Sequence, residues 1–145
     1  MTDKKIDSIS VFSPPDGAMD TFPRFEEIIE RLNSIRETAD REIVILEIYD
    51  EAPVTEDHGL VPYGYGAKML LPKTDDPDLE SQCLRECTEF VYEVMRFSRI
   101  EKLEFEVEFN DELWGDISNG VICASILEDI LGEWERHIAR MRLNS

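Results

Sequence analysis

The chain has 145 residues, which is the size of one ordinary domain, so we expect residues 1–145 to form a single acidic domain. It carries 33 Asp+Glu against 15 Lys+Arg, a formal net charge of −18 at pH 7. Nucleic acids and anionic membranes both attract basic surfaces, so we expect no direct binding to either of them. Hydrophobic residues make up 42% of the chain, which argues against a disordered chain.

The N-terminal segment and the cysteines predict a cytoplasmic protein. Residues 1–12 mix lysines with aspartates and contain no apolar stretch of the kind found in signal peptides. The longest apolar runs are far shorter than the ~20 residues of a membrane-spanning helix. Three cysteines cannot all pair with one another, and Cys83 and Cys87 are spaced to lie on one face of a helix. We interpret them as buried apolar side chains of a reducing compartment.

The first half of the chain predicts a strand, a helix and a second strand. Apolar residues alternate over 8–13, which indicates a short strand. Apolar residues at helical spacing then predict a helix over 25–35, capped by Asp20 or Thr21. Residues 42–49 are β-branched and mostly apolar, so we expect a central strand that is buried on both faces.

The middle of the chain predicts an irregular strand and a long helix. Residues 59–71 look like a strand, and Pro62, Gly64 and Gly66 indicate a bulge, a bend or an edge position. The connection from 42–49 is short, so we expect these two strands to be antiparallel. Pro77, preceded by Asp76 as a cap, then suits the start of an amphipathic helix.

The last part of the chain predicts a half-buried strand and a helix. Apolar and acidic residues alternate over 102–110, which is typical of a strand with one face in solvent. We expect a loop over 111–120 and a helix over 122–142, and the sequence leaves open whether 120–125 is strand or helix. The expected fold class is α+β, with a mainly antiparallel sheet packed against two or three amphipathic helices.

No motif for catalysis, metal binding or phosphate binding is present, so we expect neither an enzyme nor a cofactor. The two histidines, His58 and His137, lie outside the usual metal-binding spacings. His58 follows two acidic residues and has the surroundings of a general base, but a solvated loop histidine is the simpler interpretation. No nucleophile and base occur in a known catalytic pattern.

The strongest local feature is the acidic segment 101–116. It contains seven acids against one Lys102, and Leu113 and Trp114 lie inside it. One interpretation is a solvated strand face that prevents aggregation through a sheet edge. The other is a surface for a basic partner, because −18 exceeds the ~2–8 charges that solubility requires of a small domain. Trp114 then either anchors that partner or packs into the core of the protein itself.

We predict a partner-binding surface from the outward carboxylates of this segment and the residues that follow them. The main candidates are Glu104, Glu106, Glu108, Asp111, Glu112, Trp114 and Asp116, and the weaker ones are Asp57 and Tyr63.

A small acidic α+β chain with strings such as LEFEVEFNDELWGD, residues 103–116, resembles bacterial immunity proteins. In size, charge and layout the whole chain is similar to the immunity proteins of contact-dependent growth inhibition systems, the CdiI type. The resemblance implies a tight complex with a cognate basic nuclease toxin, with a toxin that cleaves ribosomal RNA as one candidate. It implies no catalytic residues.

Two other functions remain open at this point. A nucleic-acid mimic that inhibits a DNA-binding protein would carry carboxylates along one elongated face, whereas the strongest cluster here is short. A small-molecule-binding domain near Tyr63, Tyr65 and His58 would show a deep pocket with convergent polar groups.

Overall fold

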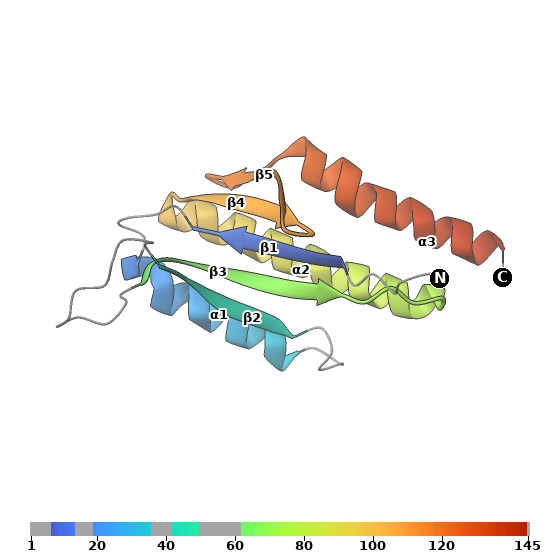
Figure 1. The fold of residues 1–145 in the computed structure, drawn as a ribbon, viewed down its shortest axis with the longest axis horizontal. Coiled ribbons are helices and arrows are strands. Elements are labelled where there is room, and N and C mark those ends of the chain that lie inside the picture. Colours follow the sequence, from blue (N-terminus) through green and yellow to red (C-terminus); the bar gives the residue numbers. More distant parts are fainter. Residues whose placement is uncertain (1–6, 14–18, 36–41, 50–61, 145) are drawn as a thin grey trace.

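Six strands form one antiparallel sheet, and the helices pack on one of its faces (Figure 1). The computed structural model describes residues 7–13, 19–35, 42–49 and 62–144. The strands are β1 (Asp7–Phe12), β2 (Ile43–Tyr49), β3 (Pro62–Leu71), β4 (Glu104–Phe109), β5 (Glu112–Ser118) and β6 (Val121–Ile122), in the spatial order β2-β3-β1-β4-β5-β6. The α+β class with a mainly antiparallel sheet is therefore confirmed.

The helices begin close to where the sequence predicts them. They are the short 3₁₀ turn η1 (Met19–Thr21), α1 (Phe22–Ser34), α2 (Pro77–Glu101), the π-helical segment η3 (Ile126–Gly132) and α3 (Glu133–Leu143). Asp76 caps α2 as expected, because its carboxylate accepts the backbone N–H of Asp78 at 2.9 Å. Thr21 precedes α1 but makes no capping bond; its hydroxyl instead pairs with the Tyr65 hydroxyl at 2.6 Å.

The core lies between the sheet and the helices, and aromatic rings fill its centre. Phe25 of α1 lies 4.8 Å from Tyr65 of β3 and 5.9 Å from Phe105 of β4, measured between ring centroids. Burial raises the pKa of Tyr65 to about 12, and the hydrogen bond with Thr21 lowers it in part. The ring cluster joins α1 to two strands that are distant in sequence.

β2 is an edge strand, so the prediction of a central strand buried on both faces is wrong. Ile43 is buried against the helices, whereas Val44 is 54% exposed on the opposite face. The apolar run alone indicated burial on both sides, but no described helix covers the second face. The expected antiparallel pairing of β2 with β3 is confirmed, and its register shifts between Ile48 and Tyr49, near the proline and glycines of β3.

Residues 112–118 form β5, so the predicted loop over 111–120 is also wrong. Asn110 and Asp111 both have positive φ, 54° and 65°, which gives a tight two-residue turn between β4 and β5. A second such turn at Asn119 and Gly120 leads into β6. The open question about 120–125 is thereby answered: 121–122 is strand, and helix begins at residue 124.

Candidate functional site

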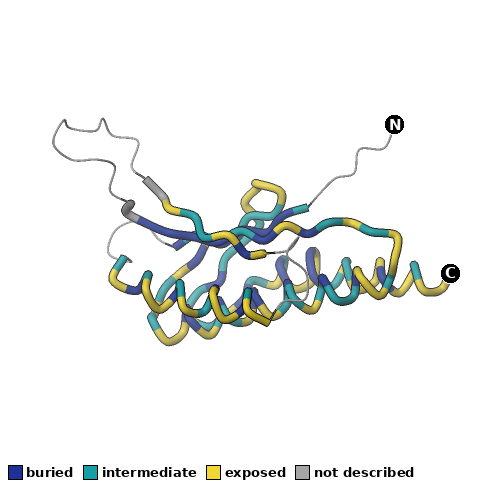
Figure 2. The backbone as a smooth tube through the Cα atoms, turned by 90° about the horizontal axis from the view of Figure 1, so that it is seen from below, coloured by how far each residue is buried: buried dark blue, intermediate teal, exposed yellow. Residues whose placement is uncertain are grey.

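The face of the sheet opposite the helices carries most of the carboxylates predicted to bind a partner. Figure 2 shows the helices together on one side of the sheet. Along β4, Phe105 and Val107 are fully buried on the helix side, whereas Glu104 and Glu106 are exposed on the other side. The predicted alternation of β4 is therefore confirmed. We call the side without described helices the open face.

The open face is acidic on one half and apolar on the other. The acidic half consists of Glu104, Glu106 and Glu108 of β4 and Asp116 of β5, which lie on this face by register. The other half, on β1, β2 and β3, carries Phe12, Val44, Leu46 and Leu70, with Ser10 and Lys68 among them by register; we call it the apolar half. The ring of Phe12 lies over Gly66, where an added Cβ would approach that ring to 2.8 Å. The same Cβ would lie even closer to the backbone carbonyl oxygen of Val11, so glycine is required at this close approach of β1 and β3.

Two carboxylates of the acidic half face each other across neighbouring strands. Glu106 is paired in register with Asp116, and like charges in that arrangement destabilise a sheet by roughly 0.2–1 kcal/mol. Among the described ion pairs, Lys68–Asp111 at 3.3 Å is the only one that involves the predicted surface. Few described cations therefore neutralise the negative charge of the acidic half.

Glu108 is the carboxylate most affected by this crowding. Partial burial raises its pKa, and the charges of Asp111 and Glu106 raise it further, while Lys68 lowers it. Its register partners are Ser10 on β1 and Leu113 on β5. The charge of Glu108 is therefore opposed by two neighbouring carboxylates and favoured by one lysine.

Asp111 and Glu112 lie at the tip of the β4–β5 hairpin, and both are exposed. The turn is held by Asn110, whose side-chain oxygen accepts the backbone N–H of Ser8 at 2.9 Å. The backbone N–H of Asn110 donates to the carbonyl of Ser8 at the same distance. The tip of the hairpin is therefore fixed to the start of β1.

Trp114 packs into the protein, and Leu113 takes the exposed position beside it. A register shift between Val107 and Glu108 makes Trp114 the extra residue of a β-bulge. Its ring is half-buried against the core and meets Phe109 edge-on, with 6.0 Å between centroids. Leu113 is 65% exposed and lies opposite Glu108. Of the two roles considered for Trp114, the geometry favours packing.

The weaker candidates cannot be placed with the acidic half. Asp57 and His58 lie outside the described residues, and the side chain of Tyr63 lies outside them as well. Tyr65 is fully buried in the aromatic cluster, so its hydroxyl is not available to a ligand from solvent. A small-molecule site near Tyr63 and Tyr65 thus has no support from the described part of the chain.

Within the described residues, no group of three or more His, Cys, Asp or Glu side chains is placed to hold a metal ion. No described helix combines the length and apolarity needed to cross a membrane. A cavity does exist on the helix side of the sheet, and His137 lines it. Sequence reasoning did not single out that cavity, because its walls come from five separate parts of the chain.

No family model, curated protein sequence or solved structure matches this chain.

Proposed function

We propose that this protein is an immunity protein, which binds and neutralises a basic nuclease toxin domain through the open face of its sheet. The observation that carries the proposal is the acidic half of that face. Four carboxylates lie there on two adjacent strands, and two of them, Glu106 and Asp116, stand directly opposite each other. A protein under selection for stability alone gains from separating such charges.

A cationic partner would turn this concentration of negative charge into a source of attraction. Arginine and lysine side chains placed against the acidic half would relieve the repulsion between Glu106 and Asp116 and the crowding around Glu108. Nuclease domains present such side chains because they bind phosphate backbones. Rim carboxylates of this kind chiefly accelerate association, and added salt screens the effect.

The apolar half of the open face offers a protein partner apolar contact area in addition to charge. Val44 on β2 and Leu70 on β3 are exposed across β1 from the acidic half, and Leu113 is exposed within that half. Protein interfaces commonly join an apolar centre to a charged rim, whereas a mimic of a phosphate backbone needs charge along its whole length. This mixture supports a protein-binding surface rather than a nucleic-acid mimic. The proposed role requires no catalysis by this chain.

The test is co-expression with a nuclease toxin encoded beside this gene, with cell survival and the association rate of the purified pair as readouts. We expect the triple variant Glu104→Lys, Glu106→Lys and Glu108→Lys to slow association by about tenfold or more at low salt and to abolish protection. The matched control reverses Glu26, Glu27 and Glu30 on α1, which changes the net charge by the same amount on the helix side.

Equal loss of association in both triple variants would show that only net charge matters, and the open face would then not be the interface. Loss in neither variant would place the interface elsewhere. Thermal unfolding of each variant shows whether it is folded, because a lost fold also removes binding. A folded wild-type chain that fails to protect against the adjacent toxin would overturn the immunity role itself.

A further inference from the structure

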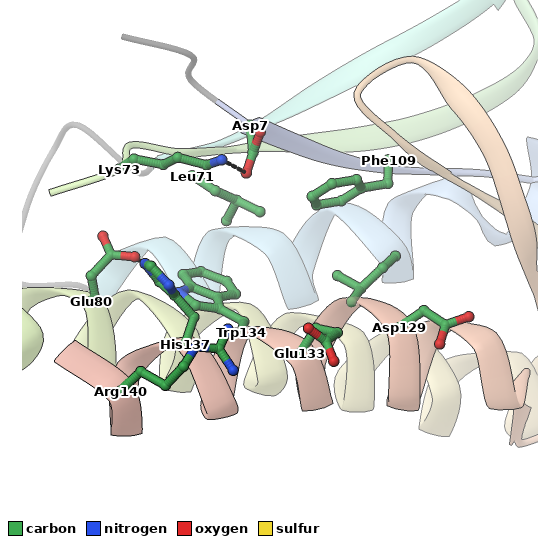
Figure 3. Close-up of a pocket in the computed structure, with 11 residues that line it drawn as sticks. Asp7, Leu71, Lys73, Glu80, Phe109, Asp129, Glu133, Trp134, His137 and Arg140 are labelled. Carbon is green, nitrogen blue, oxygen red and sulfur yellow. Dashed lines mark hydrogen bonds and ion pairs between the residues drawn. The ribbon is translucent and has the colours of Figure 1, made fainter. Parts of the chain in front are cut away.

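A cavity of about 280 Å³ lies between the sheet and the C-terminal helical region (Figure 3). It is lined by the ends of β1, β3 and β4, the first turn of α2, and one face of η3 and α3. Its volume is near the ~300 Å³ at which small-molecule sites begin. The cavity is on the helix side, since Leu71 and Phe109 line it while their neighbours Leu70 and Glu108 belong to the open face.

The centre of the cavity is apolar. Its apolar lining consists of Leu71, Phe109, Ile130 and Trp134. Leu71 and Ile130 are buried, and Phe109 and Trp134 are half-buried at the cavity wall. The indole N–H of Trp134 donates to the Glu80 carboxylate at 3.0 Å, which fixes the orientation of the ring. A planar or branched apolar group therefore has a preformed surface to pack against.

Three of the four carboxylates around the cavity are already engaged. Glu80 is buried, and it also accepts the backbone N–H and the hydroxyl of Thr74 at 2.9 and 3.2 Å. Asp7 pairs with Lys73 at 3.2 Å, as Figure 3 shows. Glu133 pairs with Arg136, which is not one of the residues that line the cavity. The fourth, Asp129, lies toward the opposite end from His137 in Figure 3.

Two groups with donor capacity remain at the other end. His137 and Arg140 stand three residues apart on α3, so they share one face of the helix. Both are exposed, and neither makes a side-chain hydrogen bond or an ion pair with another described residue, whereas most described arginines do. The charge of Arg140 acts on Glu133 at longer range and helps to lower the pKa of that carboxyl. Guanidinium and imidazole N–H groups are well suited to carboxylate oxygens.

The helix that forms this wall is unusual. Residues 126–132 are π-helical, and both Asp129 and Ile130 of the lining come from this segment. At its end, the backbone N–H of Glu133 donates to the carbonyl of Glu128, five residues earlier, and to that of Ile130. π-helical turns are rare and occur often at functional sites. This is a second observation that points to a ligand at this wall.

We propose that the cavity binds a small organic carboxylate with an aromatic or branched apolar body. The apolar body packs between Phe109, Ile130 and Trp134, and the carboxylate meets Arg140 and His137. The net charge of −18 opposes an anion at long range, but at physiological salt charges beyond ~8 Å are screened. The inference does not depend on the proposed function, because the sheet separates the cavity from the acidic half.

The experiment uses the full chain labelled with ¹⁵N and titrated with 3-phenylpropionate. The chain has two tryptophans, so the indole N–H signals of Trp134 and Trp114 report on the cavity and on the bulge separately. We expect a saturable shift of the Trp134 signal with a Kd of about 1 mM or tighter, and a smaller shift for Trp114. The neutral 3-phenylpropan-1-ol and the cationic 3-phenylpropylamine should bind about tenfold more weakly.

Variants then assign the carboxylate contact. Arg140→Gln and His137→Gln together should weaken 3-phenylpropionate binding about tenfold and leave binding of the alcohol unchanged. Arg99→Gln, an exposed arginine at the far end of α2, removes one charge away from the cavity and should change neither. Binding of the amine equal to or tighter than that of the carboxylate, or the same weakening in Arg99→Gln, would overturn the proposal. So would the absence of a saturable Trp134 shift in a well-folded spectrum.

Discussion

At the scale of single residues, Trp114 packs against the core and Leu113 is exposed, although the sequence around them does not distinguish the two. Both follow a run of acids, and either one suits an interface anchor. The bulge turns the Trp114 ring toward Phe109 and leaves Leu113 exposed opposite Glu108. The bulge thereby assigns these two neighbouring residues to opposite faces of the sheet.

Trp114→Ala is expected to lower the free energy of unfolding by roughly 1–3 kcal/mol, because a half-buried ring and its contact with Phe109 are lost. Leu113→Ala serves as the control and should change it by less than about 0.5 kcal/mol. Urea denaturation followed by circular dichroism measures both. A larger loss in Leu113→Ala than in Trp114→Ala would contradict the described bulge.

Glu108→Gln is expected to stabilise the isolated protein slightly at pH 7. The folded state raises the pKa of Glu108, so it binds the proton more tightly than the unfolded state does. Stability from this group is then present below its unfolded pKa and is lost as pH rises through its folded pKa. Glutamine carries no titratable charge, so the variant avoids this loss of stability. The gain in the free energy of unfolding at pH 7 should be no more than about 0.5 kcal/mol, because solvent screens the group.

The measurement for Glu108 is the difference in melting temperature between the variant and the wild type, taken from pH 3 to pH 7. The difference should grow as pH rises from 3 and become constant near neutrality. Glu30→Gln, on the solvent side of α1, controls for the loss of one negative charge. A constant difference at all pH values, or a variant less stable at pH 7, would refute the assigned cause.

At the scale of elements, two tight turns build the β4–β5–β6 part of the sheet. Asn110-Asp111 and Asn119-Gly120 both have positive φ, the geometry of two-residue hairpins. Asn-Gly is the strongest short-range hairpin signal in a sequence, so β6 was predictable from 119–120. Asn-Asp is a weaker signal, and the acids and the tryptophan beside it favoured a loop. The extra residue of the bulge also breaks the alternation on which strand prediction depends.

Gly120→Ala is expected to lower the free energy of unfolding by about 1–2 kcal/mol. Its φ is +85°, and an added Cβ would lie 2.9 Å from the Cβ of Arg99 on α2. Asn119→Gly is the matched control, because Gly adopts the φ of 49° at that position without strain. Thermal unfolding of both variants checks the turn; equal stability of Gly120→Ala and wild type would exclude the described geometry.

At the scale of the whole molecule, charge is the dominant property. Within the described residues, seven ion pairs involve six acids, and the open face concentrates carboxylates on two adjacent strands. Repulsion within a chain of net charge −18 opposes the folded state, and salt weakens that repulsion within a Debye length of ~10 Å at 0.1 M. The acidic half should account for a measurable share of this effect.

Raising NaCl from low to moderate concentration is therefore expected to raise the melting temperature by a few degrees, as a gain of ~1 kcal/mol does in a domain of this size. The double variant Glu106→Gln with Asp116→Asn should start from a higher melting temperature and gain less from salt, because the opposed pair is gone. Differential scanning calorimetry in a salt series measures both. A melting temperature that falls with NaCl would contradict net repulsion.

Residue types and their periodicity determined the class of this protein. The alternation over 102–110, the capped helix from Pro77 and the antiparallel pair of β2 and β3 all follow from local chemistry, because side-chain direction repeats every two or 3.6 residues. The net charge and the acidic segment likewise follow from composition, and with them the expectation of a basic partner. The expected burial of Cys83 and Cys87 on one face of a helix is also confirmed.

Tertiary structure decided which face of each element is exposed to solvent and which residues distant in sequence come into contact. The apolar run of β2 does not reveal that the strand lies at an edge, because strand order is set by packing with α1 and β3. The pairing of Glu106 with Asp116 depends on register across a bulge, and the cavity joins Asp7 to Arg140 from opposite ends of the chain. These contacts are non-local, so only the folded arrangement of strands and helices determines them.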